Sequence, residues 1–318
     1  MSSLNKQRIA IVLPCYNENE TIINFLIELN DVLIKEPQFN FIVIVVDDDS
    51  TDDSLEMLNG FEGFEQQIDF NLLKLPYNMG HQTAILQGLM HANNKGVDYA
   101  IVIDSDGQDN PNEITNLLKF TTTDYQVVNV IRGRREESYL FKILYWIYKL
   151  IFKFIIGKKM NFGNYCMISN KILKTTVRTS FIHFAAHISK QKVKSTSILS
   201  NRRKRIKGKS KMNLNSLIHH AFKSFIEYAE ELLMMFFKAF LIVIVGIVVL
   251  FSYIIYQKLF TQNALLGWTS TISFILINIA ILCFGFFIIG LLLLNILKQR
   301  RDIDKVMYVV SNTKKDSN

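Results

Sequence analysis

The sequence has little cysteine and lacks the motifs of two common nucleotide-binding folds. Its three cysteines, Cys15, Cys166 and Cys283, are widely spaced and form no Cys-x-x-Cys pair. This spacing argues against a disulfide framework or a structural zinc site, and for a reducing compartment. Neither G-x-G-x-x-G nor G-x-x-x-x-G-K-[ST] occurs, so a classical dinucleotide-binding fold and a P-loop are disfavoured. Residues 1–8 are polar and precede a strand-like run, which predicts that no signal peptide is present.

Charge is nearly absent from two long stretches near the C-terminus. Ala239–Tyr256 and Thr271–Leu297 are apolar runs, and each reaches the roughly 18–20 residues needed to cross a bilayer. The loop between them carries a single lysine, and three basic residues follow the second run. The positive-inside rule therefore places both the large N-terminal part and the C-terminal tail in the cytoplasm. Buried helices of a soluble protein are the alternative interpretation.

Positive charge is in excess and clustered. The formal net charge is +8, from 36 Lys and Arg against 28 Asp and Glu, with basic clusters at 132–135, 142–159, 202–211 and 298–301. Clusters beside apolar segments suit an anionic membrane surface or a phosphate ligand better than a nucleic-acid duplex, so no nucleic-acid partner is expected. The pattern over 139–156 predicts a helix in the membrane interface, with a core helix as the alternative.

The first 131 residues alternate between short apolar runs and helical patterns. Apolar runs at 9–13, 41–46, 70–75, 100–103 and 127–131 predict buried strands. Helical spacing at 21–34 and a helix at 83–92 lie between them. This order predicts an α/β fold with a mostly parallel, doubly wound sheet. The polar loops that follow the strands would then surround one crevice at one edge of the sheet.

A pair of carboxylates follows the fourth predicted strand. Asp104 and Asp106 stand at alternate positions where the apolar run ends, and Gln108 adds an amide oxygen. Two hard oxygen donors at this spacing suit Mg²⁺ or Mn²⁺, which takes its remaining ligands from waters and substrate phosphates. The alternative is an ordinary polar turn, because Asp, Gly, Gln and Asn are common turn residues.

Four motifs in order carry a resemblance to a known family. They are Pro14–Glu18, Val46–Asp52, Asn78–Gln82 with Ala84 and Gly88, and Asp104–Asp109 with Pro111. In these motifs the chain resembles family 2 glycosyltransferases with the GT-A fold. Residues 132–138, residues 205–211 and the two apolar runs are similar to those of the membrane-anchored polyprenyl-phosphate glycosyltransferases. That subgroup includes dolichyl-phosphate mannose synthases and bactoprenol glucosyltransferases. The resemblance covers nearly the whole chain.

The resemblance implies a set of site residues. The residues implied for the nucleotide sugar are Pro14, Tyr16, Glu18, Asp47, Asp48, Gly80, Gln82, Asp104 and Ser105. Those implied for the lipid phosphate are Arg132, Arg135, Arg205, Ser210 and Lys211. Asp104, Asp106 and Gln108 would hold the metal, and the catalytic set would be Asp104, Asp106, Arg132 and Arg135. The alternative for the basic segment 202–211 is a surface loop that touches anionic lipid.

Two stretches depart from the subgroup. Where it commonly shows Asp-x-Gly-Asp-Phe-Arg, this chain has Asn161, Asn164 and Cys166 in place of the two acids and the arginine. An amide cannot act as a general base, which a sugar hydroxyl acceptor would normally need. A lipid monophosphate is already anionic and can attack without one. In the second acidic loop, Asp49 stands where glycine is common.

These features predict an inverting, metal-dependent glycosyltransferase of the cytoplasmic membrane. Its donor would be a nucleoside-diphosphate sugar and its acceptor undecaprenyl phosphate or a related polyprenyl phosphate. One alternative acceptor is a hydroxyl of a lipid-linked glycan, and a non-enzymatic membrane protein that kept the fold is a further alternative.

The predicted organisation has four parts. A cytoplasmic GT-A domain at 1–212 would be followed by a juxtamembrane amphipathic helix at 213–231, two transmembrane helices at 232–297 and a cytoplasmic tail at 298–318. An apolar patch in the tail, Val306–Val310, suggests a strand that could form a homo-oligomer.

Overall fold

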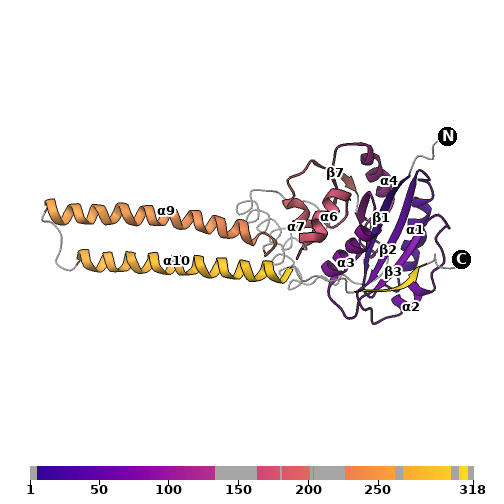
Figure 1. The fold of residues 1–318 in the computed structure, drawn as a ribbon, viewed down its shortest axis with the longest axis horizontal. Helices are drawn as coiled ribbons and strands as arrows, with labels where there is room; N and C mark the ends of the chain where they lie inside the picture. The colour runs from indigo at the N-terminus through magenta and orange to yellow at the C-terminus, as the bar shows by residue number, and fades with distance from the viewer. Residues whose placement is uncertain are drawn as a thin grey trace. The chain divides into compact units, whose positions relative to one another are not determined.

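The computed structural model describes residues 6–132, 163–179, 181–200, 203, 226–261, 268–301 and 308–313 (Figure 1). Within these residues the chain divides into two compact units. The first takes the described residues up to Glu227 and those from Arg301 onward, and the second takes Tyr228–Arg300. The predicted interfacial helix near 139–156 and most of the juxtamembrane segment 213–231 lie outside the described residues.

A single mixed sheet forms the centre of the first unit (Figure 1). Over the described residues it has eight strands, in the order β7-β5-β6-β4-β1-β2-β3-β8. The strands are β1 (Gln7–Cys15), β2 (Phe39–Asp47), β3 (Asp69–Lys74), β4 (Tyr99–Val102), β5 (Val127–Arg132), β6 (Cys166–Ser169), β7 (Ser195–Ser200) and β8 (Val309–Thr313). Four pairings are parallel, β1–β2, β1–β4, β2–β3 and β5–β7, and three are antiparallel. The predicted mostly parallel α/β sheet is confirmed.

Apolar residues fill both faces of the sheet, as continuous apolar strands require. In β1, Ile9 and Ile11 belong to one buried cluster while Ala10 and Val12 belong to the other. Helix α1 (Ile22–Leu33) packs into the first cluster, and α3 (His81–Asn94) packs into the second. The other helices in the described part of this unit are α2 (Ser54–Asn59), α4 (Glu113–Leu118), the 3₁₀ turn η1 (Lys119–Thr122), α6 (Asn170–Thr179) and α7 (Phe184–Lys190).

Helix α3 approaches the sheet closely at Gly88. A Cβ atom at this position would overlap the side chain of Val12 and lie 3.0 Å from a methyl carbon of Val46. A larger residue would therefore push the helix away from β1 and β2. Gly88 belongs to the third sequence motif, and its role is to let α3 pack against the strands whose ends form the candidate site.

The second unit contains two long apolar helices. They are α9 (Ala229–Tyr256) and α10 (Trp268–Arg301), and the π-helical turn η2 (Gln257–Thr261) follows α9. The stretches long and apolar enough to span a bilayer are Ala229–Tyr256 and Ser270–Ile296, with mean hydropathies of 2.9 and 2.8. None of either apolar window is buried within the protein. The rings of Phe237 and Phe287 stack at 4.7 Å, so α9 and α10 contact each other.

The C-terminal strand returns to the sheet of the first unit. β8 pairs antiparallel with β3 in the same chain, so that β8 rather than β3 stands at this edge of the sheet. A strand thus forms close to the apolar patch at 306–310, but it pairs within the chain. Just before β8, the hydroxyl of Tyr308 lies 2.8 Å from His91 Nδ1, and His91 Nε2 lies 2.8 Å from Asn71 Oδ1. His91 therefore connects α3 to β3 and to the tail.

The buried His91 predicts a pH-dependent stability. Burial lowers the pKa of His91 from 6.5 to about 4. The unfolded chain thus binds a proton between these pH values that the folded chain does not, and His91 lowers the free energy of unfolding as the pH falls from 6.5 toward 4. We expect the full-length His91→Asn variant in detergent to be less stable at pH 8. Its melting temperature should fall less steeply than that of wild type between pH 6.5 and 4.

The Tyr308→Phe variant is the matched control for this prediction. It removes one partner of His91 but keeps the titrating group, so it should lose about 1–3 kcal/mol at neutral pH while keeping the pH dependence. Parallel melting curves for wild type and His91→Asn across this pH range would contradict the assignment.

Candidate active site

Three neighbouring strands bring their carboxyl ends to one edge of the sheet. β1 lies between β2 and β4, and both pairings are parallel. Pro14 and Cys15 of β1 stand opposite Val46 and Asp47 of β2. The loops that carry the first, second and fourth sequence motifs therefore meet, as the alternation of strands, polar loops and helices predicted.

Hydrogen bonds join these loops to one another. The Ser105 hydroxyl donates to the carbonyl of Pro14 at 2.7 Å, which ties the loop after β4 to the end of β1. The backbone N–H of Glu18 donates to Ser54 Oγ at 2.8 Å, which ties the loop after β1 to α2. Two residues adopt left-handed backbone, Asn17 with φ 53° and Asp49 with φ 58°. The glycine that the family commonly has in place of Asp49 is thus explained, because glycine adopts this conformation without strain.

A cleft of about 370 Å³ opens at this edge of the sheet. Its lining comprises Pro14, Cys15, Tyr16, Glu18, Asp48, Asn78, Gly80, His81, Ala84, Asp104, Ser105 and Asp106. Of the residues implied for the nucleotide sugar, all line the cleft except Asp47 and Gln82. Asp106 of the implied metal set also lines it, whereas Gln108 does not. Seven of the nine residues implied for the nucleotide sugar therefore lie around one cleft, and their binding roles stay predictions.

The residues implied for the lipid phosphate are not brought to this cleft by any described contact. Arg132 ends β5, and its side chain lies outside the described part of the structure. Arg135, Arg205, Ser210 and Lys211 lie outside the described residues, as does Asn161. Their roles stay predictions.

Two acidic side chains of the second motif support the backbone. Asp47 is fully buried, and its Oδ2 accepts a hydrogen bond from the Ser50 N–H at 3.2 Å. Asp48 accepts from the N–H groups of Met79 at 2.7 Å and Gly80 at 2.9 Å, and so shapes the turn before α3. Burial raises the pKa of both carboxyls, while these hydrogen bonds partly offset the effect. Asp48 still lines the cleft, whereas Asp47 does not.

His81 is a cleft residue that the sequence analysis did not single out. It is the first residue of α3, and its Nε2 lies 3.1 Å from Asp104 Oδ1. The side chains of His81 and Asp104 are 42% and 18% exposed, so both can meet a ligand. The signal was available, since His81 lies within the Asn78–Gln82 motif, but only the fold places its ring against the carboxylate of another motif.

The charge of the cleft fits a bound divalent cation. Four carboxylates line it, those of Glu18, Asp48, Asp104 and Asp106. A diphosphate would be repelled by this set unless a cation lay between them. Asp104 and Asp106 are hard oxygen donors of the kind that Mg²⁺ and Mn²⁺ prefer. Within the described ranges, no three His, Cys, Asp or Glu side chains are grouped as a complete metal site, so further ligands would come from substrate or water.

Two cysteines of the sheet, Cys15 and Cys166, are buried. Burial raises the pKa of the Cys15 thiol, which lines the cleft, and keeps it protonated. Cys166, which stands where the subgroup commonly has arginine, is 1% exposed and begins β6 between β4 and β5. Tyr165 before it is also buried, and its hydroxyl donates to the carbonyl of Asn110 at 3.1 Å. This stretch therefore contributes to the core.

Arg203, a residue of the basic segment 202–211, is hydrogen-bonded to the loop after β4. Its Nη1 lies 2.6 Å from Glu28 Oε1, and its Nη2 donates to Asn110 Oδ1 at 2.6 Å. Its backbone N–H donates to the carbonyl of Gln108 at 3.1 Å, while the Gln108 N–H donates to Asp106 Oδ1 at 3.1 Å. One basic residue of the segment 202–211 is thus bound within the protein, next to the predicted metal loop.

Comparison with protein families and curated sequences gives consistent matches. The model of glycosyl transferase family 2 matches residues 10–178. The undecaprenyl-phosphate 4-deoxy-4-formamido-L-arabinose transferase of Serratia proteamaculans is 29% identical over 221 residues, which is 67% of this chain and 65% of that protein. The transferase of the same name from Yersinia pestis is 30% identical over 68% of this chain and 67% of that protein. An uncharacterized glycosyltransferase of Bacillus subtilis, YkcC, is 24% identical over 96% of this chain and 93% of that protein.

The fold is also found in solved structures. Glucosyl-3-phosphoglycerate synthase from Mycobacterium tuberculosis, in complex with Mn²⁺, UDP and phosphoglyceric acid, matches with a TM-score of 0.53 and 16% identity over 71% of this chain and 78% of that chain. Mannosyl-3-phosphoglycerate synthase from Rubrobacter xylanophilus matches with a TM-score of 0.51 and 17% identity over 72% and 74%. At these identities the matches establish a shared GT-A-like fold.

Proposed function

The chain belongs to glycosyl transferase family 2, and we propose that it transfers a sugar from a nucleoside diphosphate to the phosphate of a polyprenyl lipid. The observation that carries this proposal is the acidic cleft, where Asp104 and Asp106 lie at the carboxyl edge of a GT-A-like sheet. Two apolar helices in the same chain support a lipid acceptor. Relatives named as undecaprenyl-phosphate transferases support it as well. The alignment with the transferase of Serratia proteamaculans spans about 65% of that protein's length.

The donor would occupy the cleft with its diphosphate near the start of α3. Tyr16, Glu18 and Asp48 line the cleft and offer a ring and carboxylate oxygens to the base and ribose. Gly80, which has no side chain, and the imidazole of His81 stand at the N-terminal end of α3. The N-terminus of a helix favours a bound negative charge. Mg²⁺ or Mn²⁺ held by Asp104 and Asp106 would stabilise the charge that develops on the departing nucleoside diphosphate. Gln108 stays a predicted further ligand.

The acceptor is best matched by a phosphate. A lipid monophosphate is anionic at neutral pH and can attack the anomeric carbon without a general base, giving inversion in a single displacement. The amides at 161 and 164, in place of the subgroup's acids, are compatible with this chemistry. In this proposal Arg132, Arg135 and the segment containing Arg205, Ser210 and Lys211 bind the lipid phosphate. A hydroxyl of a lipid-linked glycan is the second candidate acceptor.

The carboxylate pair predicts loss of transfer when either side chain is made neutral. Membranes carrying the full-length protein are incubated with radiolabelled UDP-, GDP- and dTDP-sugars, undecaprenyl phosphate and Mn²⁺, and the lipid is extracted. We expect a lipid monophosphosugar labile to mild acid, and a fall of about 10²-fold or more for Asp104→Asn or Asp106→Asn. Asp124→Asn, whose side chain is 90% exposed in a bridge to Lys194, is the matched control. Unchanged activity in both site variants, or in strong chelator, would exclude the metal-dependent mechanism; an extended glycan would indicate the hydroxyl acceptor.

The acceptor assignment predicts a selective effect on the lipid substrate. Arg135→Ala or Lys211→Ala removes a charged donor to phosphate, so the KM for polyprenyl phosphate should rise roughly tenfold while the KM for the nucleotide sugar changes little. Lys192→Ala, an exposed lysine before β7, serves as the control. An equal rise in both KM values would instead place these residues at the diphosphate.

The two apolar helices predict that the protein is a multi-pass protein of the cytoplasmic membrane with both termini inside. Lysine and arginine at the C-terminal end of α10 and a nearly uncharged connection between the helices support this orientation. In intact cells, Asn263→Cys should react with an impermeant maleimide, whereas Lys6→Cys should react only after permeabilisation. The protein with its three native cysteines is the background control. Labelling of Lys6→Cys from outside would reverse the topology.

A further inference from the structure

Glu227 is a buried carboxylate outside the cleft. Its side chain is 1% exposed, and it is the residue immediately before Tyr228, the N-cap of α9. Burying an ionised carboxylate costs several kcal/mol unless it is paired and hydrogen-bonded. The partners that compensate this cost should therefore indicate what Glu227 does.

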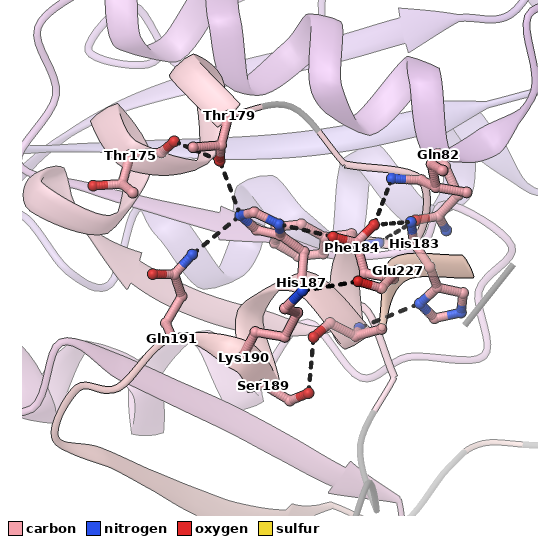
Figure 2. Close-up of polar contacts among 12 residues, drawn as sticks. Gln82, Thr175, Thr179, His183, Phe184, His187, Ser189, Lys190, Gln191 and Glu227 are labelled. Atoms are coloured by element: carbon pink, nitrogen blue, oxygen red, sulfur yellow. Dashed lines mark hydrogen bonds and ion pairs between the residues drawn. The ribbon is translucent and has the colours of Figure 1, made fainter. Parts of the chain in front are cut away.

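Glu227 is hydrogen-bonded to one short helix, α7, and to the two residues before it (Figure 2). Oε2 accepts from the N–H groups of Ile182 at 2.8 Å and His183 at 3.4 Å. Oε1 lies 3.1 Å from His187 Nδ1. The backbone carbonyl of Glu227 accepts from Lys190 Nζ at 2.9 Å. One residue thus holds both ends of α7, including the N–H groups that precede its first turn.

Helix α7 is joined in turn to α3. The N–H of Phe184, the first residue of α7, donates to Gln82 Oε1 at 2.6 Å (Figure 2). Both groups are buried, with Phe184 0% exposed and Gln82 9% exposed. Because a backbone N–H can only donate, this contact fixes which end of the Gln82 amide is oxygen. The amide nitrogen is then directed to the other side.

The Gln82 amide nitrogen points back to the cleft. It lies 3.4 Å from His81 Nδ1, and His81 Nε2 lies 3.1 Å from Asp104 Oδ1. A carboxylate accepts only, so Nε2 donates to Asp104, and in the neutral ring Nδ1 then accepts from the Gln82 amide. The contacts therefore run without a gap from Glu227 through α7, Gln82 and His81 to Asp104.

We propose that Glu227 is a positioning residue for the sugar transfer, which through α7 and Gln82 holds His81 against the carboxylate of Asp104. The kinetic part of this inference rests on the proposed function. An oriented Asp104 presents its second oxygen to the cleft in a defined direction, and such support of a ligand side chain improves the geometry of the reacting groups. Glu227 acts through other residues and does not line the cleft.

Two variants interrupt the path at different points. In Glu227→Gln, the amide NH₂ replaces one acceptor oxygen and faces either the backbone N–H groups or the His187 ring, so one set of partners is lost. In Gln82→Met, the acceptor of the Phe184 N–H is lost with little change in shape. We expect each to lower kcat for transfer about tenfold, since small displacements of reacting groups have effects of this order or larger. The KM for polyprenyl phosphate should change by less than about twofold.

The control must be another buried polar side chain on α3, the helix that carries Gln82, and it must not reach the cleft. His91→Asn meets this requirement, because His91 lies on α3 and is hydrogen-bonded to Asn71 and Tyr308. It should lower the melting temperature of the full-length protein and leave kcat within about twofold of wild type. A loss of kcat in His91→Asn equal to that in Glu227→Gln would show that general destabilisation is the cause, and would overturn the proposal.

The double variant tests whether Glu227 and Gln82 act in one path. If they do, the effects of Glu227→Gln and Gln82→Met on kcat are not additive, and the double variant falls about as far as either single one. If the two reductions in kcat multiply in the double variant, the two residues act independently and the proposed path from Glu227 to Asp104 is wrong.

Hydrogen–deuterium exchange gives a readout that does not depend on the reaction. Backbone exchange over residues 78–86 should rise in Glu227→Gln and Gln82→Met, and should match wild type in His91→Asn. Unchanged exchange over residues 78–86 would overturn the proposed path from Glu227 to Asp104 even if kcat falls. A wild-type protein that transfers no sugar would contradict the proposed function. The exchange experiment alone would then test the path of contacts from Glu227 to Asp104.

Discussion

The parallel alignment of β2, β1 and β4 is the constraint on which the site depends. Because these strands are neighbours and run the same way, three loops that are about 30 to 90 residues apart in sequence end side by side. The Ser105–Pro14 hydrogen bond joins two of them directly. The shape of the cleft, its charge and the placement of Asp104 and Asp106 follow from this alignment. Gly88 also contributes to the site, because it lets α3 pack closely against β1 and β2.

Buried polar side chains provide the second level of organisation in the first unit. Asp48 shapes the turn before α3, His91 links the same helix to the C-terminal tail, and Gln82 links it to α7. Each of these groups would be costly to bury alone, and each is held by named partners. Helix α3 is thus supported at both ends by polar contacts and along its length by apolar packing. Such contacts favour one arrangement over others that would bury a similar apolar area.

The chain combines two kinds of apolar surface with different environments. In the first unit the apolar strands and helices are covered on both faces of the sheet. In the second, side chains such as Ile242 and Phe286 remain 74% and 71% exposed, an arrangement that water disfavours and a bilayer accommodates. The junction between the units falls between Glu227 and Tyr228. Glu227, the last residue of the first unit before α9, is therefore also the residue whose buried carboxylate is hydrogen-bonded to α7 and to the two residues before it.

Local patterns were sufficient for much of this protein. Continuous apolar runs predicted β1 to β5, because strands covered on both faces of a sheet are apolar along their length. Helical spacing of apolar residues predicted α1, and a helix was also predicted over most of α3. The two apolar helices followed from their length and lack of charge. Asp104 and Asp106 were recognised because their chemistry and their place after a strand are local properties. β6 and β7 were not predicted from the residues, since no alternation or turn signal distinguishes them clearly.

Only the tertiary structure decided which side chains of the motifs face the cleft and which support it. Asp47 and Asp48 are adjacent and chemically identical, yet one is enclosed and the other lines the site. His81 and Gln82 stand side by side at the start of α3, but one meets Asp104 and the other meets α7. The contact of Glu227 with His187 joins positions 40 residues apart, and that of Tyr308 with His91 joins positions 217 apart. Sequence spacing determines what a residue can do chemically, whereas its partners depend on chain segments that only folding brings into contact.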